Sequence, residues 1–432
     1  MRKVYLSFLG RGALDKEAKE YRYTPAVYEL QGRKSKKTEF VQAAEIEILG
    51  AANFDLFVVA ATEVSRDSHF ASLESQLKDL GAKKISLITI GEDMSAEGQW
   101  NWFEQILSRI EFRDKLTVDM THGFRLTPVI FSAAINFLQK ARNITIRAVY
   151  YGAFEKRDEF GCAPIVDMKD FYIVNEWAEA VSRLVEDADA RKMAAVASNA
   201  PGFQTGGLND KKIVEALEDL TNAIRNVEVN RVAEKAKTAL DLITKQRASA
   251  SFTGKTLLDL VIDKFSLLVM DHPPSGKYDR DYFVIQREII QLLLEHKLFM
   301  QAYTVMREFI GSIGLIEVDK AGYATKQGRD QRYRFSEVFI KMVELPEQEW
   351  NFPEKAINGV RRLEPYYQKL KALGVVDLLR GVVGELIRYR NGFDHAWTSK
   401  DRAPSDIEDA GSIMFERLRQ ILSLMEERGL LR

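Results

Sequence analysis

The chain has 432 residues, of which 46% are hydrophobic, so it can bury the cores of roughly two or three domains. Its 62 lysine and arginine residues and 63 aspartate and glutamate residues give a formal net charge of −1. This balance argues against a broad surface that coats nucleic acid and leaves any RNA contact to a local patch. The single cysteine, Cys162, excludes an intramolecular disulfide and fits a reducing cytoplasm.

The sequence predicts no membrane segment. No apolar run reaches about 18 residues, the length expected of a membrane-spanning helix. The start, MRKVYLSFLGRG, has a basic end and a short apolar run, which is typical of a first strand rather than a signal peptide. We therefore expect a cytoplasmic protein.

Residues 1–175 alternate between predicted strands and helices. This alternation predicts a Rossmann-like α/β domain with a mostly parallel sheet covered on both faces. Thr38 is expected to cap the first helix. The expected strands are 3–9, 56–61, 84–90, 116–121, 144–151 and 164–168, with a hairpin arm at 21–30, and the expected helices are 39–49, 70–80, 100–110 and 129–141.

A candidate nucleotide site lies in the segment LTVDMTHGFRLTP, at residues 116–128. A strand is followed by a tight turn, in which Gly123 can adopt backbone angles that other residues avoid, and by a helix that tolerates Pro128 in its first turn. Backbone N–H groups and the helix N-terminus would face an anionic ligand, and Arg125 would add a cation. An ordinary strand-to-helix turn, with His122 as a local hydrogen bonder, explains the pattern equally well.

Two further strand ends carry suggestive residues, at positions 7–12 and 62–65. Ligands of parallel sheets bind beyond the carboxyl ends of the strands, so the three segments converge on one site if their strands are neighbours. The residues GRG at 10–12 do not form a GxGxxG motif, and the chain has no GxxxxGK[ST] motif. A dinucleotide cofactor and a P-loop are therefore not supported.

After residue 170 the predicted structure is helical. The segment NAPGFQTGGLN at 199–209 has the composition of a linker, and a polar segment near 315–335 is expected to be an insertion or hairpin. Ser405 or Asp406 would cap the last helix. No cluster has metal-ligand spacing. The expected helices are 177–197, 211–226, 229–245, 256–270, 281–294, 299–313, two or more after 350 that include 375–390, and 407–428.

A second candidate site is the hexapeptide RNGFDH at residues 390–395. Cleavage of RNA by its own 2′-OH needs a base, an acid and a cation, and histidine and arginine supply these roles near neutral pH. Asn391 and His395 share a helix face, whereas Arg390 and His395 lie about 140° apart around the axis. The long Arg390 side chain, or a loosened turn at Gly392, must close this gap. Because one histidine cannot easily be both acid and base, two copies meeting across a dimer axis would complete the site.

Simpler interpretations of these polar residues remain open. Arg390 and His395 can bond carbonyl groups at a helix end or pair with Asp394, as such residues often do. Arg307 and Glu308 are most simply an ion pair, and a role in bracing the Arg390 segment is a lesser hypothesis. The patterns around His69 and His296 are those of a helix-start or surface residue and of a solvent-facing helical residue.

Taken together, these stretches resemble the CRISPR-associated CARF–HEPN ribonucleases of type III systems, within the DxTHG family. The matching pieces cover most of residues 1–175: VYLSFLGRG near the start, TEFVQAA at 38–44, DMTHGFRLTP at 119–128, AVYYGAFE at 148–155 and PIVDMKDF at 164–171. In the second half the match rests on helical character, on QAYTVMREFI at 301–310 and on RNGFDH, which fits the Arg-x4-His pattern of HEPN nucleases. One departure is that Leu-Thr-Pro follows Arg125, where a Ser or Leu directly before the proline is more familiar.

The resemblance implies a CARF ligand-sensing domain at 1–175, a helical linker at 176–209 and a helical HEPN nuclease domain at 210–432. The CARF pocket would bind a cyclic oligoadenylate; we expect cyclic tetra-adenylate, although the sequence leaves the ring size open. Bound ligand would switch on a metal-independent endoribonuclease that cuts single-stranded RNA at the shared HEPN interface of a homodimer or higher homo-oligomer. No cofactor other than this allosteric activator is implied. The residues carried over are Ser7, Gly10, Arg11, Gly12, Thr62, Glu63, Thr121, His122, Gly123, Phe124 and Arg125 for the ligand, and Arg390, Asn391 and His395 for catalysis.

Two other functions remain alternatives. In a ring nuclease the CARF pocket itself would cleave the cyclic messenger, with help from Ser7, Thr62 or His122. In a non-catalytic regulator the helical half would bind a partner or DNA, and His395 would be dispensable.

Overall fold

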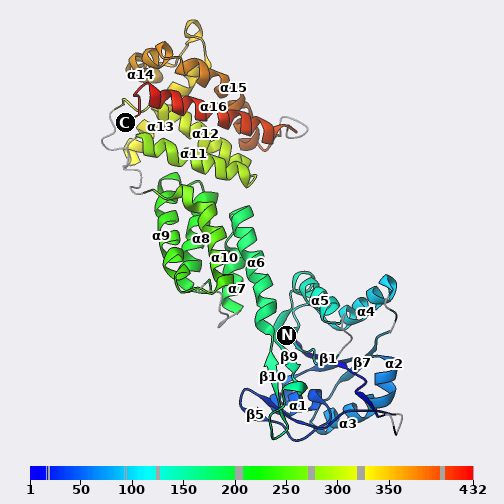
Figure 1. Ribbon diagram of the computed structural model, residues 1–432. Coiled ribbons are helices and arrows are strands. Elements are labelled where there is room, and N and C mark those ends of the chain that lie inside the picture. Colours follow the sequence, from blue (N-terminus) through cyan, green and yellow to red (C-terminus); the bar gives the residue numbers. More distant parts are fainter. Residues whose placement is uncertain are drawn as a thin grey trace. The chain divides into compact units, whose positions relative to one another are not determined.

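The computed structural model describes residues 1–15, 17, 20–91, 93, 95–122, 127–199, 208–270, 278–318, 326–398 and 404–431. The chain forms two compact units, Met1–Asn175 and Glu176–Arg432 (Figure 1). Helix α6 (Lys169–Asp187) begins in the first unit and ends in the second. None of the helices searched among the described residues combines the length and apolar character needed to cross a membrane.

The first unit is an α/β domain, as the sequence predicted. Its strands are β1 (Lys3–Leu9), β2 (Ala13–Asp15), β3 (Glu20–Arg22), β4 (Val27–Leu30), β5 (Arg33–Lys34), β6 (Leu56–Ala61), β7 (Ile85–Thr89), β8 (Lys115–Asp119), β9 (Thr145–Gly152) and β10 (Cys162–Asp167). Its helical segments are α1 (Val41–Leu49), η1 (Ala51–Asn53), α2 (Glu63–Ser65), η2 (Arg66–Phe70), α3 (Ala71–Asp79), α4 (Ala96–Arg109), α5 (Thr127–Ala141) and η3 (Phe154–Lys156).

Eight strands form one sheet in the order β5-β4-β10-β9-β8-β1-β6-β7. The pairs β9–β8, β8–β1, β1–β6 and β6–β7 are parallel, whereas β10 runs antiparallel to β9. The prediction of a mostly parallel sheet is therefore confirmed. Strands β2 and β3 form a separate antiparallel hairpin.

Helices cover both faces of this sheet (Figure 1). On one face, buried residues of α4 and α5 pack on alternate residues of β1, such as Val4 and Leu6. On the other face, α1 and α3 pack on Tyr5 and Leu9. Because both sides of β1 are buried, its sequence is an almost unbroken apolar run rather than an alternating one.

The predicted start of the first helix is wrong by two residues. Helix α1 begins at Val41, and its N-cap is Phe40, which makes no side-chain capping bond. The Thr38 hydroxyl instead accepts a hydrogen bond from the Phe40 N–H at 3.2 Å and donates one to Gln76 at 3.0 Å. Thr38 therefore ties the approach of α1 to α3, because Gln76 lies on that neighbouring helix.

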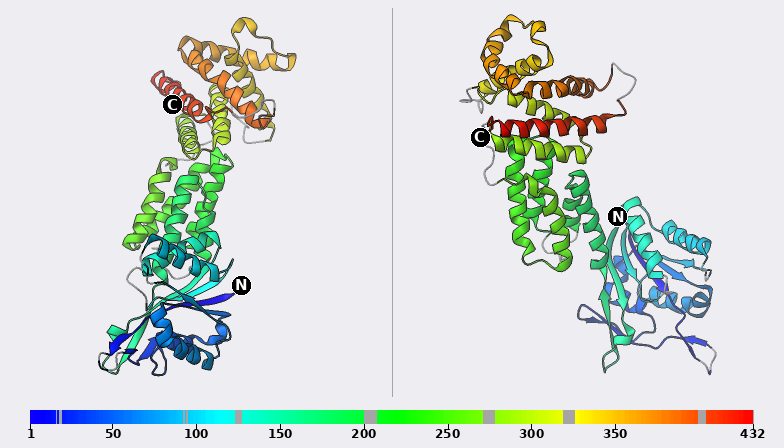
Figure 2. Two further views of the ribbon diagram at one scale, coloured as in Figure 1. Left: turned by 90° about the vertical axis from the view of Figure 1, so that its right-hand side faces the viewer. Right: turned by 45° about the horizontal axis from the view of Figure 1, so that its top comes forward.

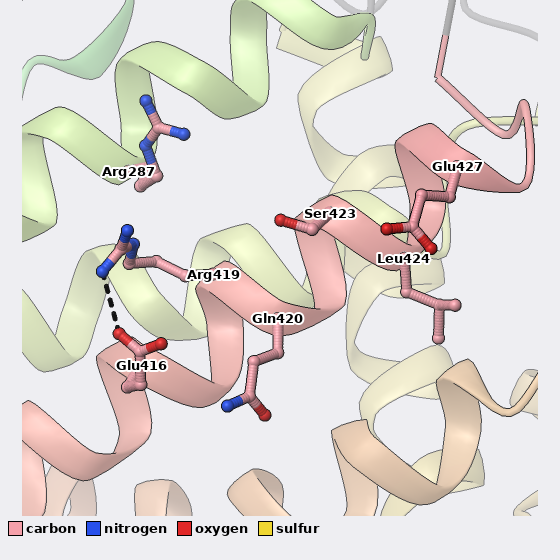
Figure 3. Close-up of a pocket in the computed structure, with 7 residues that line it drawn as sticks. All are labelled: Arg287, Glu416, Arg419, Gln420, Ser423, Leu424 and Glu427. Atoms are coloured by element: carbon pink, nitrogen blue, oxygen red, sulfur yellow. Dashed lines mark hydrogen bonds and ion pairs between the residues drawn. The ribbon is translucent and has the colours of Figure 1, made fainter.

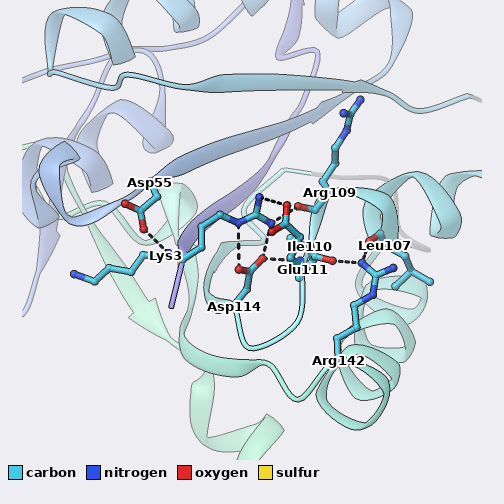
Figure 4. A network of polar contacts seen from close by, with 9 residues as sticks. Lys3, Asp55, Leu107, Arg109, Ile110, Glu111, Asp114 and Arg142 are labelled. Atoms are coloured by element: carbon cyan, nitrogen blue, oxygen red, sulfur yellow. Dashed lines mark hydrogen bonds and ion pairs between the residues drawn. The ribbon is translucent and has the colours of Figure 1, made fainter.

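The amino ends of the central strands are held by an ionic network (Figure 4). The Arg2 guanidinium donates to both carboxylate oxygens of Asp114, at 3.1 and 2.6 Å, and to Glu111 at 2.7 Å. The Asp55 carboxylate accepts from the Lys3 N–H at 2.7 Å. Asp114 is almost fully buried, and the bidentate pairing compensates its desolvation. This end of the sheet is thus fixed structurally and lies opposite the carboxyl ends that carry the first candidate site.

The second unit is helical throughout its described residues, so the predicted all-α second half is confirmed (Figure 2). Besides the end of α6, its helices are α7 (Arg191–Asn199), α8 (Lys211–Arg225), α9 (Val229–Arg247), α10 (Phe252–Phe265), η4 (Ser266–Leu268), α11 (Arg280–Glu295), α12 (Phe299–Ile313), α13 (Lys326–Glu344), η5 (Glu347–Glu349), α14 (Glu354–Ala372), α15 (Val375–Asp394) and α16 (Ile407–Glu427).

Two groups of helices make up this unit. Helix α8 packs on α7 and α9, and α9 packs on α10. In the second group α12 contacts α11, α13, α15 and α16. The later part of the predicted insertion, from residue 326, belongs to α13, whereas residues 319–325 lie outside the described residues. Asp406 is the N-cap residue of α16, as expected, but makes no side-chain capping bond.

Candidate functional sites

The three strand ends singled out from the sequence lie side by side. Strand β1 pairs in parallel with β8 on one side and with β6 on the other. In this register Ser7 lies opposite Asp119, and Leu9 lies opposite Ala61. The segments after β1, β6 and β8 therefore leave the sheet at one edge. The sequence analysis expected these segments to converge only if their strands were neighbours, and the strand order β8-β1-β6 shows that they are.

Two glycines after β1 allow a close approach of the β2–β3 hairpin. A Cβ atom on Gly10 would lie 3.1 Å from the Tyr23 hydroxyl and 3.2 Å from the His122 Cβ. Gly12 has a φ of +73°, and a Cβ there would lie 2.6 Å from the Arg22 carbonyl oxygen. A larger residue at either position would push the hairpin off the strand ends.

Tyr23 and two histidines gather at this edge. The Tyr23 ring centroid lies 4.8 Å from that of His69 and 5.0 Å from that of His122. The His69 Nε2–H donates to the Arg11 carbonyl at 3.0 Å. Burial, followed by the neighbouring His69, lowers the pKa of His122 to about 4, so its imidazole is neutral at physiological pH.

The sequence interpretation missed part of this cluster. His69 was expected to be a local cap or surface residue, but its side chain is buried. Tyr23 lies within the hairpin arm expected at 21–30 but was not singled out as a candidate site residue. The helical segment that contains His69 begins at Glu63, with α2. A prediction that started the helix there could have used the helical spacing of its residues to put His69 on the buried face.

A buried polar cluster underlies the same edge. Ser7 and Asp119 are completely buried, on the side of the sheet that α1 covers. From α1, Gln42 donates to the Phe8 carbonyl at 2.8 Å, and Glu45 accepts from the Tyr5 hydroxyl at 2.7 Å. Burial raises the pKa of Asp119 to about 6, and burial followed by the Asp119 charge raises that of Glu45 well above its ordinary value.

Asp119 organises the turn that follows β8. Its Oδ1 accepts from the Thr121 N–H at 2.8 Å and from the Thr121 hydroxyl at 2.5 Å. The same hydroxyl accepts from the Gly152 N–H at 2.7 Å. Thr121 therefore links β8 to β9, and its hydroxyl is already engaged within the protein.

The remaining predicted ligand residues differ in exposure. Thr62 is buried, and its hydroxyl accepts from the Ser65 N–H at 3.2 Å, whereas Glu63 and Arg11 are exposed. Gly123, Phe124 and Arg125 lie outside the described residues. At this edge of the sheet the charged residues Arg11 and Glu63 are therefore exposed, whereas the polar residues Ser7, Thr62 and Asp119 are buried.

The second candidate site lies at the end of α15. The helix continues through Gly392 to Asp394, and His395 is its C-cap residue. A loosened turn at Gly392, one of the two ways considered for closing the gap between Arg390 and His395, is therefore not present. The Arg390 guanidinium lies 3.1 Å from the Asp394 carboxylate, which is the local ion pair considered in the sequence analysis. Asn391, Asp394 and His395 are exposed.

An aromatic cluster supports this helix end. Tyr303 of α12 lies with its ring 5.3 Å from Tyr389 and 5.6 Å from Phe393. Its hydroxyl donates to the Ile407 carbonyl at the start of α16, at 2.8 Å. Three helices are thus joined directly behind the exposed Asn391, Asp394 and His395.

Arg307 makes a stronger contact than the sequence suggested. Its Nη1 lies 3.7 Å from Glu308, the expected partner. Its Nη2 also pairs closely with Glu337 of α13, and Arg307 itself is buried. The pair joins α12 to α13 within the helical core. His296, expected to face solvent, is also buried, and its Nδ1–H donates to the Glu186 carbonyl.

An open groove of about 310 Å³ lies between α11 and α16 (Figure 3). Arg419 pairs with Glu416 at 2.9 Å, and Arg287 pairs with its neighbour Glu288. The groove is lined by Arg287, Glu416, Arg419, Gln420, Ser423, Leu424 and Glu427. Both arginines of the groove are therefore engaged in ion pairs. The described residues also hold no group of three or more His, Cys, Asp or Glu arranged to bind a metal ion.

Comparisons with known proteins give a family context. No protein-family model matches the chain. Over 283 residues, or 63% of its length, the chain is 20% identical to the CRISPR-associated protein MJ1674 of Methanocaldococcus jannaschii. Over this region the chain is therefore similar in sequence to a protein named as CRISPR-associated. This finding confirms that part of the resemblance, although the chain spans only 41% of the length of that relative.

One solved structure aligns with nearly the whole chain. Csm6 of Enterococcus italicus, bound to cyclic hexa-2′-fluoro-hexa-dAMP, aligns with 99% of this chain and 95% of its own. The sequence identity is 11% and the TM-score is 0.49. This likeness is too weak to carry a functional assignment.

Proposed function

We propose that this CRISPR-associated protein is a ribonuclease of the cytoplasm that a cyclic oligoadenylate activates. The first unit would act as the CARF sensor, and the second unit would contain the HEPN nuclease. Cyclic tetra-adenylate is the messenger we expect. Sequence similarity to a CRISPR-associated protein and the order of motifs along the chain support this assignment.

The observation that carries the sensor proposal is the adjacency of β8, β1 and β6. Their carboxyl ends bring Gly10, Arg11 and Gly12 beside Thr62 and Glu63, next to Thr121 and His122. A phosphodiester ring requires close backbone approach and hydrogen-bond donors. The exposed Arg11 would supply hydrogen-bond donors, and Arg125 would add a second cation.

Ser7, Thr62 and Thr121 would support this pocket in a different way. Ser7 is completely buried, and the hydroxyl groups of both threonines already make hydrogen bonds within the protein. We therefore assign them to shaping the floor of the pocket rather than to its exposed rim. The exposed positions would make the direct contacts.

The nuclease proposal rests on Arg390, Asn391 and His395 at the end of α15. His395 would transfer protons to or from the attacking 2′-OH and the leaving 5′ oxygen, and Arg390 would hold the phosphate. Near pH 7 the neutral imidazole can act as the base and the protonated imidazole as the acid. The products would be a 2′,3′-cyclic phosphate and a 5′-hydroxyl, and the reaction would require no metal ion.

A second copy of the chain would complete this site. Within one copy the Arg390 side chain turns to Asp394, and His395 is the one histidine of the hexapeptide. Acid and base roles need two proton-transfer groups, which a homodimer supplies as two histidines. An approaching phosphate would compete with the Asp394 carboxylate for the guanidinium group.

The test is cleavage of a fluorescent single-stranded RNA in EDTA, with and without cyclic tetra- or hexa-adenylate. We expect cleavage that appears only with one ring size. His395→Ala should abolish it while messenger binding persists, and Arg125→Ala should weaken binding. Arg388→Ala is the matched control, because it removes an exposed arginine of the same helix end and leaves the hexapeptide intact.

Three results would redirect the assignment. Loss of the cyclic messenger itself, unaffected by His395→Ala, would favour the ring nuclease. Messenger binding with no cleavage of RNA or messenger would favour a non-catalytic regulator. Undiminished RNA cleavage by His395→Ala would show that the nuclease site has been assigned wrongly.

A further inference from the structure

The end of α15 is closed by a specific hydrogen-bond pattern. The Ala396 N–H donates to the Phe393 carbonyl at 3.1 Å, and the Trp397 N–H donates to the Gly392 carbonyl at 2.7 Å. This pair of bonds is the Schellman motif, in which the residue after the C-cap takes a left-handed conformation. Glycine usually occupies that position, but here Ala396 has a φ of 49° and Trp397 a φ of 56°.

Positive φ angles at two consecutive residues with side chains are rare. Such a conformation persists where surrounding contacts enforce it, and it tends to occur at functional sites. This turn lies directly after His395.

The Trp397 indole supplies that contact by lying across Gly392. A Cβ atom on Gly392 would overlap the six-membered ring of the indole, with 2.5 Å to its Cε3. The indole also lies 5.6 Å from the Phe393 ring and 6.4 Å from the Tyr389 ring. Trp397 thus closes over the last helical turn and joins the aromatic cluster that includes Tyr303.

His395 is held between these contacts through its backbone. Its N–H donates to the Asn391 carbonyl at 3.0 Å. Its carbonyl accepts from both the Thr398 N–H and the Thr398 hydroxyl, at 3.0 and 2.9 Å. With the backbone fixed on both sides, the exposed imidazole can move mainly through its own side-chain rotations.

We propose that Trp397, seated on Gly392, is the positioning residue for His395. It would hold the left-handed turn closed and thereby fix where the imidazole meets the RNA. The inference rests on the proposed nuclease function, and Trp397 takes no part in proton transfer. Gly392 is required because any side chain there would displace the indole.

The test is a double-mutant cycle with Gly392→Ala, Trp397→Ala and the double variant, with Trp397→Phe as the conservative change. We expect Trp397→Ala to lower kcat for RNA roughly tenfold or more, because small displacements of a catalytic group cost that much, while KM changes little. Trp397→Phe should retain most of the rate. Gly392→Ala should resemble Trp397→Ala, and the double variant should be no slower than Trp397→Ala alone.

The thermal stabilities give an independent sign. Alanine normally stabilises a helix relative to glycine, so Gly392→Ala should raise Tm in the Trp397→Ala background. In the wild-type background it should lower Tm, because the methyl group and the indole cannot share the space. Additive effects of the two substitutions on kcat and Tm would overturn the proposal.

Hydrogen exchange of the peptide that contains residues 392–398 tests the turn without any activity assay. Trp397→Ala should speed exchange at these amides, and Trp397→Phe should do so less. Unchanged hydrogen exchange in Trp397→Ala would show that Trp397 does not hold the turn closed, even if RNA cleavage were absent. A raised KM with unchanged kcat would instead assign the indole to RNA binding. Normal cleavage by Trp397→Ala, with none by His395→Ala, would refute this inference alone.

Discussion

Replacing Asp119 by asparagine should stabilise the protein at neutral pH. Asp119 is completely buried at the end of β8, and burial raises the pKa of its carboxyl to about 6 from an ordinary 3.8. Among the described residues, neither its Oδ2 nor the Gln42 Oε1 has a partner in hydrogen-bonding geometry, although the Gln42 amide lies beside the carboxylate. An asparagine could accept the two bonds from Thr121 without carrying a buried charge.

The sign follows from proton linkage. Between pH 3.8 and about 6 the folded state holds this proton and the unfolded state does not, so this carboxyl makes the protein less stable as pH rises through that window. The shift corresponds to about 3 kcal/mol in full above pH 6, and to about half of that at pH 5. Asparagine does not titrate, so its advantage should grow between pH 5 and pH 7.5 by about 1.5 kcal/mol.

Scanning calorimetry of the full chain at pH 5 and 7.5 measures this effect. The Tm of Asp119→Asn minus that of the wild type should therefore be larger at pH 7.5 than at pH 5. For a unit of this size we expect the increase to be roughly 3–6 °C. Asp114→Asn is the matched control, since it breaks the buried pair with Arg2 and should destabilise at both pH values. A lower Tm for Asp119→Asn at pH 7.5 would show instead that the protein stabilises the ionised carboxylate.

Three further outcomes are expected. His122→Asn should flatten the acid side of the stability profile, because a pKa of about 4 in place of 6.5 costs about 3 kcal/mol as pH falls from 6.5 to 4; an unchanged profile in urea titrations would contradict the burial of its imidazole. Asp394→Asn should change stability by less than about 0.5 kcal/mol and lower KM for RNA a few-fold by freeing Arg390, whereas loss of cleavage would give Asp394 a chemical role. Gly12→Ala should cost more than the roughly 1–2 kcal/mol of left-handed strain, since its Cβ meets the Arg22 carbonyl. Gly32→Ala, with a similar φ of +79° and open space, is its control, and equal costs in chemical denaturation would refute the clash.

Much of the fold could be predicted because it depends on local pattern. The strands at 3–9, 56–61 and 84–90 are short apolar runs, and they lie within one residue of β1, β6 and β7. The long helices α12, α15 and α16 have apolar residues at helical spacing and lie near their predicted ranges. Helix starts were less predictable, because Thr38 was free to bond Gln76 of another helix rather than its own N-terminal turn.

The candidate sites show the same division. The strand-to-helix turn and the RNGFDH segment were visible as residue types at fixed spacing. The partners of those residues were not, because Tyr23 and His69 reach His122 only when the β2–β3 hairpin and the segment after β6 fold against the end of β1. Similarly, the pairing of Arg390 with Asp394 is local along the chain. The position of the Trp397 indole across Gly392 depends on a left-handed turn, which the sequence does not predict.

The sequence by itself determined the alternation of an α/β half with a helical half, because periodicity and turn residues act within a few positions along the chain. It also determined which chemical groups each candidate site can offer. Only the tertiary structure decided that β8, β1 and β6 are neighbours, that Asp119 and Glu45 are buried together, and that Trp397 closes on Gly392. These features arise from contacts between segments distant in sequence or from backbone angles imposed by packing, and neither leaves a periodic pattern to detect.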